Sequence, residues 1–213
     1  PGQCFRFCTP SRMQPSSTAP QKLAEQWNSI LFFENVRSLS RYSFTYSFPD
    51  SFDITWTDYA GYINASRKAG ATLNVAFQVG HATLRSAVIG QEDRPPTADE
   101  LDKMKKLAGE SLDAGALGFS TGLFYAPGYY ARTDEVIAIA EEAGKRNKLY
   151  STHQRDEGAS SVGLFVSLNE AIEIGRRAEC KVQISHVKCD TFSVWGQADK
   201  YLELFVLEHF LNF

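Results

Sequence analysis

The chain has only four cysteines among its 213 residues, and their spacing matches no zinc-finger pattern. Four cysteines are too few for a chain of this size to be a disulfide scaffold, so reduced thiols are the default. Small buried or half-buried side chains are the simplest interpretation of Cys8, Cys180 and Cys189. The fold must therefore be held together by a packed core.

Long apolar runs and runs of positive charge are lacking as well. No stretch approaches the roughly 20 apolar residues of a membrane-spanning helix, and the first residues lack the charged start and apolar run of a secretory signal. The net charge of -3 gives no field that would gather nucleic acid or an anionic membrane. With 43% hydrophobic and 22% charged residues, we expect a soluble, cytoplasmic protein. Small neutral or acidic molecules remain open as substrates.

The sequence divides near residue 55. Residues 1–55 contain prolines, many serines and an alternation of aromatic residues, and they predict an irregular N-terminal segment that could be the start of a barrel with an insertion. From residue 56 to residue 213 helix and strand signals alternate regularly. We expect this second part to be the fragment of a catalytic domain.

Local signals set the boundaries of the predicted elements. Thr97 and Glu100 form a T-x-x-E capping box, which predicts the start of a helix. Asp134 and Glu135 place carboxylates where the first turn of a helix favours them. The predicted helices cover residues 58–68, 97–115, 133–146, 163–178 and 195–213, and the predicted strands cover residues 72–79, 116–120, 149–153 and 182–186.

The spacing of the strands predicts a parallel sheet. The strand ends at Ser120, Thr152 and Ser185 are separated by 32 and 33 residues, which is the length of one strand, one crossover helix and two short loops. An open doubly wound sheet and a (β/α)8 barrel both fit, but no G-x-G-x-x-G follows a strand to support a dinucleotide fold. A barrel needs eight strands and about 250 residues, so four clear strands predict an incomplete one.

Three of the four histidines lie at the ends of predicted strands, where the site of a parallel α/β fold forms. A single histidine in such a place is more often structural than a ligand, and His81 is interpreted in that way. His153 and His186 end two successive strands, each after a small hydroxyl residue. Two imidazoles on adjacent strands suit a zinc ion, which still needs a third ligand such as a bridging thiolate or carboxylate.

Other candidate residues lie beside these histidines. Arg155 and Lys188 could hold a substrate carboxylate, with an ion-paired or solvated loop charge as the alternative for each. Phe124 and Tyr125 follow a strand in a segment rich in glycine, which suits a shaped loop at the mouth of a site. Packing in the core is the competing interpretation of both aromatic residues.

Five short segments carry a specific pattern in a fixed order: Val79-Gly-His-Ala-Thr-Leu-Arg85, Gly115-Ala-Leu-Gly-Phe-Ser-Thr-Gly122, Tyr150-Ser-Thr-His-Gln-Arg-Asp-Glu-Gly158, Gln183-Ile-Ser-His-Val-Lys188 and Trp195-Gly-Gln-Ala-Asp199. Together they resemble the N-acyl-D-amino-acid deacylases, or D-aminoacylases, of the amidohydrolase superfamily. The resemblance covers about residues 56–199. It implies an α/β fold, an incomplete (β/α)8 TIM-type barrel of the metal-dependent amidohydrolase kind.

The resemblance also implies roles for single residues. His153 and His186 would bind one or two zinc ions, and Lys188 would contact the substrate carboxylate. Phe124 and Tyr125 would line the pocket for the substrate side chain. Gly2-Gln-Cys4 resembles the family's G-N-C-G metal segment, although Phe5 stands where the family has glycine, and it implies Cys4 as a further ligand.

The implied reaction is hydrolysis of an N-acyl-D-amino acid to a carboxylate and a D-amino acid. We expect the family's H-x-H metal motif upstream of Pro1 and its general-base aspartate beyond Phe213, which would leave the chain alone inactive. A hydantoinase-like or dihydroorotase-like cyclic amidase is an alternative on the same scaffold. A non-catalytic truncated remnant that binds a metal or a partner is another.

Overall fold

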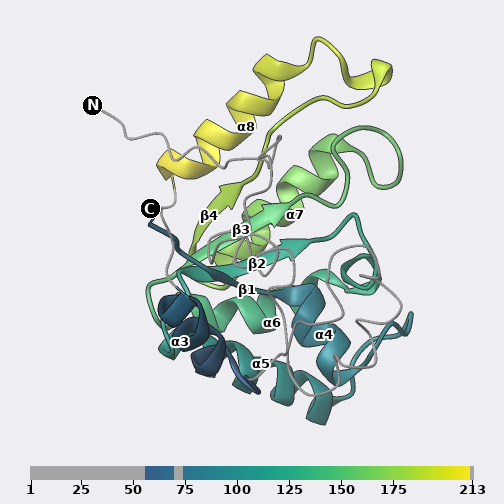
Figure 1. Ribbon diagram of the computed structural model, residues 1–213. Coiled ribbons are helices and arrows are strands. Elements are labelled where there is room, and N and C mark those ends of the chain that lie inside the picture. Colours follow the sequence, from purple (N-terminus) through teal and green to yellow (C-terminus); the bar gives the residue numbers. More distant parts are fainter. Residues whose placement is uncertain (1–55, 70–73, 212–213) are drawn as a thin grey trace, which may run out of the picture.

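The computed structural model describes residues 56–69 and 74–211 (Figure 1). The predicted N-terminal segment and the first two residues of the strand predicted over residues 72–79 lie outside these residues. Four parallel strands form one sheet in the order in which they occur along the chain, as the strand spacing predicts. The strands are β1 (Gln78–Gly80), β2 (Gly118–Gly122), β3 (Leu149–His153) and β4 (Lys181–Ile184).

Helices connect successive strands, which makes the described part an α/β structure. Helix α5 packs against α6 and α6 against α7, so the three form a row along the sheet (Figure 1). Helix α8 packs against α7 at the β4 side. The helices are α3 (Tyr59–Ala69), α4 (His81–Val88), α5 (Ala98–Asp113), α6 (Thr133–Gly144), α7 (Leu164–Arg177) and α8 (Ala198–Leu211), with 3-10 turns η1 (Gly128–Tyr130) and η2 (Phe192–Val194).

The clearest local signals are confirmed. Thr97 is the N-cap of α5, and its side chain and that of Glu100 make both hydrogen bonds of a capping box. Helix α6 carries Asp134 and Glu135 in its first turn. Strand β3 has the predicted bounds, because its two neighbours pair with it along its length.

Two predicted strands were wrong in extent, and one helix was not predicted. In the described part of the strand predicted over residues 72–79, pairing begins only at Gln78, the partner of Gly118 at the start of β2. Strand β1 ends at Gly80 because α4 begins at His81. Helix α4 was not predicted: it has eight residues and no side chain that caps its start. Strand β4 ends at Ile184, two residues before His186.

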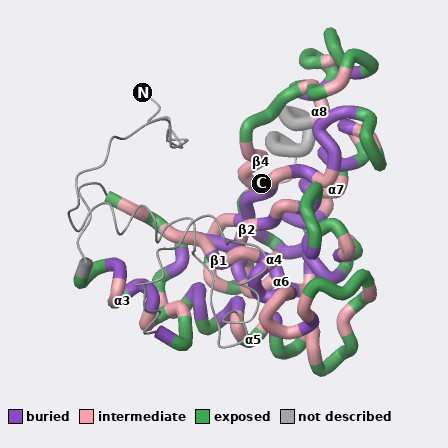
Figure 2. Tube along the Cα trace, turned by 45° about the vertical axis from the view of Figure 1, so that its right-hand side comes forward, coloured by how far each residue is buried: buried purple, intermediate pink, exposed green. Residues whose placement is uncertain are grey.

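The main core lies between the sheet and the row of helices, where Figure 2 shows the buried stretches gathered. Phe119 of β2 and Tyr150 of β3 are fully buried and stack with their ring centroids 5.9 Å apart. The buried hydroxyl of Tyr150 has a hydrogen-bond partner, because the Thr121 hydroxyl lies 3.0 Å from it. A second cluster, which includes Leu164, Leu168, Val194 and Tyr201, joins α7 to α8.

His81 is a structural residue, as predicted. It begins α4, is fully buried, and its Nε2 lies 2.9 Å from Oε1 of Glu135. Arg85 donates from Nη1 to the same carboxylate at 2.7 Å. Burial would raise the pKa of Glu135, but the hydrogen bonds from His81 and Arg85 outweigh it and hold the pKa below its ordinary value.

Within the described ranges, no helix is long and apolar enough to cross a membrane.

Close approach of α6 to the end of α7 makes Gly144 sensitive to substitution. A Cβ there would overlap the carbonyl oxygen of Ala178, which is a backbone atom. We expect Gly144→Ala to lower the free energy of unfolding by about 2–3 kcal/mol, measured by urea denaturation.

Gly109→Ala is the matched control. Its Cβ would meet the flexible ends of Arg146 and Glu142, and alanine favours a helix, so we expect a change between zero and a gain of about 1 kcal/mol. Equal losses in the two variants would contradict the close approach.

Candidate metal centre

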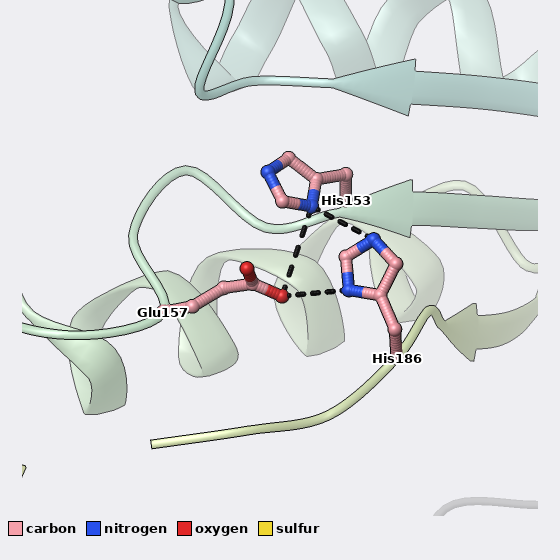
Figure 3. Close-up of side chains that lie close together, drawn as sticks. All are labelled: His153, Glu157 and His186. Atoms are coloured by element: carbon pink, nitrogen blue, oxygen red, sulfur yellow. Dashed lines mark hydrogen bonds and ion pairs between the residues drawn. The ribbon is translucent and has the colours of Figure 1, made fainter. Parts of the chain in front are cut away.

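His153, Glu157 and His186 converge at the carboxyl ends of β3 and β4 (Figure 3). Nδ1 of His153 lies 3.0 Å from Nε2 of His186. Oε1 of Glu157 lies 2.9 Å from Nδ1 of His186 and 3.7 Å from Nδ1 of His153. The sequence prediction that the two histidines lie side by side is confirmed.

The two histidines do not occupy the same position on their strands, contrary to expectation. The ladder pairs Thr152 with Ile184, so the residue that follows in register with His153 is Ser185. His186 comes one residue later, in a left-handed backbone conformation with φ 37° that non-glycine residues rarely adopt. Such backbone conformations cluster at functional sites, where the surrounding structure maintains them.

Glu157 completes the cluster, although the sequence analysis gave it no role. Its side chain is 7% exposed, and a buried glutamate is rarely without a partner. The sequence signal that could have pointed to Glu157 as a ligand is its position four residues after His153, in a loop that follows a strand. From the sequence, the third ligand is predicted only as an unspecified carboxylate or thiolate.

The donor set fits a zinc ion. The three residues offer two nitrogen atoms and one oxygen atom within 4.8 Å of one another. Tetrahedral ligands at 2.0–2.1 Å from zinc lie roughly 3.3 Å apart, close to the separation of the two histidine nitrogens. A donor hydrogen on Nδ1 of His186, directed at Glu157, would leave the lone pair of Nε2 free for the ion, as in many carboxylate-oriented metal ligands.

Local electrostatics favour neutral imidazole at His153. Burial is the largest cause that lowers its pKa below the ordinary value of 6.5. The positive charge of Lys188 acts in the same direction, while Glu157 acts against it. Since a metal binds only the deprotonated ring, His153 is ready for a metal at neutral pH.

Asp156 holds the loop that carries Glu157. Its carboxylate accepts hydrogen bonds from the backbone N–H groups of Gly158 at 2.9 Å, Ser161 at 2.6 Å and Gly163 at 2.9 Å. Burial would raise the pKa of Asp156, but these hydrogen bonds outweigh it and lower the pKa. The loop therefore has a fixed shape and presents Glu157 to the histidines.

The predicted substrate residues lie around the cluster. Lys188 contacts the Glu157 carboxylate, and its Nζ lies 3.3 Å from Nδ1 of His186. Phe124 and Tyr125 are 44% and 59% exposed, so they do not pack in the core. The Tyr125 ring stacks on His153 with a centroid distance of 5.0 Å, and the Phe124 ring meets His153 edge to face at 5.9 Å.

Another predicted residue, Arg155, has its partners elsewhere. Arg155 is 11% exposed and donates to both carboxylate oxygens of Glu170, so the ion-paired alternative describes it and a role in holding a substrate carboxylate is not supported. Cys4 lies outside the described residues.

Comparisons with known proteins agree with this geometry. No protein-family model matches the chain. The D-aminoacylase of Alcaligenes xylosoxydans xylosoxydans is 41% identical over 146 residues, which are 68% of this chain and 30% of that protein. The crystal structure of a D-aminoacylase, described as defining a subset of amidohydrolases, superposes with a TM-score of 0.70 at 36% identity. The superposition covers 74% of this chain and 32% of the D-aminoacylase chain.

The chain belongs to the N-acyl-D-amino-acid deacylase family. A deacylase for N-acyl-D-glutamate from Bordetella bronchiseptica, solved with zinc and a phosphonate inhibitor, superposes with a TM-score of 0.68 at 34% identity over 72% of this chain and 32% of that one. These deacylases are hydrolases of amide bonds. The chain spans about a third of the length of the deacylases that it matches.

Removal of either histidine should abolish tight zinc binding. We expect His153→Ala and His186→Ala each to weaken zinc binding by more than about 100-fold, because loss of an outer partner of a ligand already costs about 10–100-fold. Glu157→Gln should weaken it by about 10–100-fold. Competition with a chromophoric chelator at neutral pH measures these changes.

Glu173→Gln is the control, since Glu173 lies on α7 outside the cluster. Unchanged zinc affinity in the histidine variants would exclude these residues as ligands.

Asp156 should make the stability of the chain depend on pH. Because its pKa is lower in the folded chain than the ordinary value of about 3.9, its contribution is present above that value and is lost as the pH falls through the folded pKa. We expect Asp156→Asn to cost about 1–3 kcal/mol at pH 7, with the difference from the native chain shrinking below about pH 4.

Denaturation curves over a pH series test this expectation. Asp102→Asn, at an exposed position of α5, should change stability little at any pH. A constant cost for Asp156→Asn down to low pH would contradict a role for the charged carboxylate.

Proposed function

We propose that this chain is part of the catalytic domain of a zinc-dependent hydrolase that cleaves the amide bond of N-acyl-D-amino acids. The observation that carries the proposal is the convergence of His153, Glu157 and His186 at adjacent strand ends. The relatives support it, since their names give them N-acyl-D-amino acids as substrates and one was solved with zinc.

A partial (β/α)8 barrel is the fold that we propose for residues 56–213. Four parallel strands in sequential order and a row of helices along them support it. The sequential order favours a barrel over a doubly wound sheet, in which the strand order reverses. The superposition on a D-aminoacylase gives further support.

His153 and His186 would hold the zinc ion, with Glu157 as a third ligand or as the group that orients His186. Cys4 is proposed as a further ligand from the sequence alone. When bound, zinc supplies a Lewis acid for the amide carbonyl and a water of lowered pKa. A proton on Nδ1 of His186 that is directed at Glu157 would leave Nε2 as the donor atom for the ion.

Lys188 would hold the carboxylate of the substrate. Its side chain is half-exposed beside the cluster, where Nζ contacts Glu157. An ammonium group acts as a point charge, so it can turn from Glu157 to an entering carboxylate. The exposed rings of Phe124 and Tyr125 would accept the side chain of the D-amino acid. We propose that the general-base aspartate comes from sequence outside this chain.

Ligand binding to the zinc-loaded chain tests the proposal. We expect N-acetyl-D-leucine to bind more tightly than its L enantiomer in isothermal titration calorimetry. Lys188→Gln should weaken binding of the D compound by about tenfold, or about 1.4 kcal/mol, because the carboxylate loses its cation. Lys106→Gln, an exposed lysine on α5, is the matched control and should change nothing.

Equal affinity for the two enantiomers would contradict the proposed substrate class. Turnover by this chain, abolished in His153→Ala, would contradict the proposal that the general base lies elsewhere.

A further inference from the structure

The aromatic loop, residues 123–132, connects β2 to α6 and brings Phe124 and Tyr125 to His153. Both rings are exposed, so core packing does not fix them. At its start the backbone N–H of Leu123 donates to the carbonyl of His153 at 3.2 Å. Leu123 and Ala131 anchor the two ends of the loop in the main core, and hydrogen bonds to backbone carbonyls add to this support between them.

Arg155 supplies two of these contacts. Its Nη1 donates to the carbonyl of Tyr129 at 3.1 Å, and its Nη2 donates to the carbonyl of Ala131 at 3.0 Å. The backbone N–H of Tyr129 in turn donates to the carbonyl of Tyr125 at 2.8 Å. Tyr129 therefore links the Arg155 guanidinium to Tyr125, whose ring stacks on His153.

Glu170 of α7 fixes the guanidinium. Its Oε2 accepts from Nε of Arg155 and its Oε1 from Nη2, both at 2.8 Å, and the two side chains are 11% and 10% exposed. Oε1 also accepts from the Thr133 hydroxyl at 2.8 Å, directly after the loop. Glu170 thus holds the aromatic loop through Arg155 and through the first residue of α6.

We propose that Arg155 and Glu170 are positioning residues that set the Tyr125 ring over His153 and thereby shape the side-chain pocket of the enzyme. The part of this inference that concerns the substrate rests on the proposed function, and the part that concerns the loop does not. Arg155 acts through the loop backbone and does not contact the substrate. Its planar fork serves two carboxylate oxygens and two carbonyls at once, which a lysine cannot do.

The stacking of Tyr125 on His153 has a spectroscopic signature. A ring stacked on the imidazole shifts its C–H proton signals upfield, and the chain has only four histidines, so a spectrum of histidine-labelled protein is simple. The spectra are recorded at about pH 8.5, where histidines with a pKa near 6.5 are neutral. His153→Ala identifies the signals, and Tyr125→Leu gives their position without the stacked ring.

We expect Arg155→Ala to move the His153 signals to the positions seen in Tyr125→Leu. Arg155→Lys and Glu170→Gln should move them part of the way, because each keeps some of the hydrogen bonds. Arg146→Ala is the matched control: Arg146 forms a two-point pair with Asp113 just before β3 begins, at the other end of the strand from His153. It should lower the melting temperature without moving the His153 signals.

Two results would overturn the proposal. One is a Tyr125→Leu spectrum identical to that of the native chain, since then no stacked ring exists. The other is unmoved His153 signals in Arg155→Lys and Glu170→Gln while Tyr125→Leu moves them. The spectra need no zinc or substrate, so a chain that binds neither would refute the proposed function and leave the positioning pair intact.

Discussion

The parallel ladder between β3 and β4 is the contact on which the candidate site depends. It pairs Leu149 with Lys181 through to Thr152 with Ile184, and the backbone N–H of Ser185 continues it to the carbonyl of Thr152. Hydrogen bonds in such a ladder fix the separation of the strands, so the residues that follow them start close together. Two histidines 33 positions apart in the sequence thereby meet at hydrogen-bond distance.

Three successive charged residues after β3 have three different environments. Arg155 faces Glu170 and the aromatic loop, Asp156 faces the backbone of its own loop, and Glu157 faces the histidines. Each buried charge has its partners, as burial at low dielectric requires. Support for the candidate metal centre therefore begins with the residues next to its ligands, and it extends to α7 through Glu170.

Sequence signals were sufficient where they are local or repeated. The capping box at Thr97, the carboxylates at the start of α6 and the spacing of the strands gave the correct order of helices and a parallel sheet. These signals failed where strand pairing or the shortness of a helix determines the extent of an element. Strand β1 is short because β2 begins opposite Gln78 and α4 begins at His81. Helix α4 was too short and too poorly capped to be recognised.

By itself, the sequence determined the α/β order of elements, the family and the two histidines, because capping, periodicity and motif spacing are written in neighbouring residues. The tertiary structure alone decided that Glu157 joins the histidines, that His186 lies one residue beyond the register of His153, and that Arg155 serves the aromatic loop. These facts depend on which groups lie close together after the strands pair. A charge in a loop carries no local sign of the partner that it will meet.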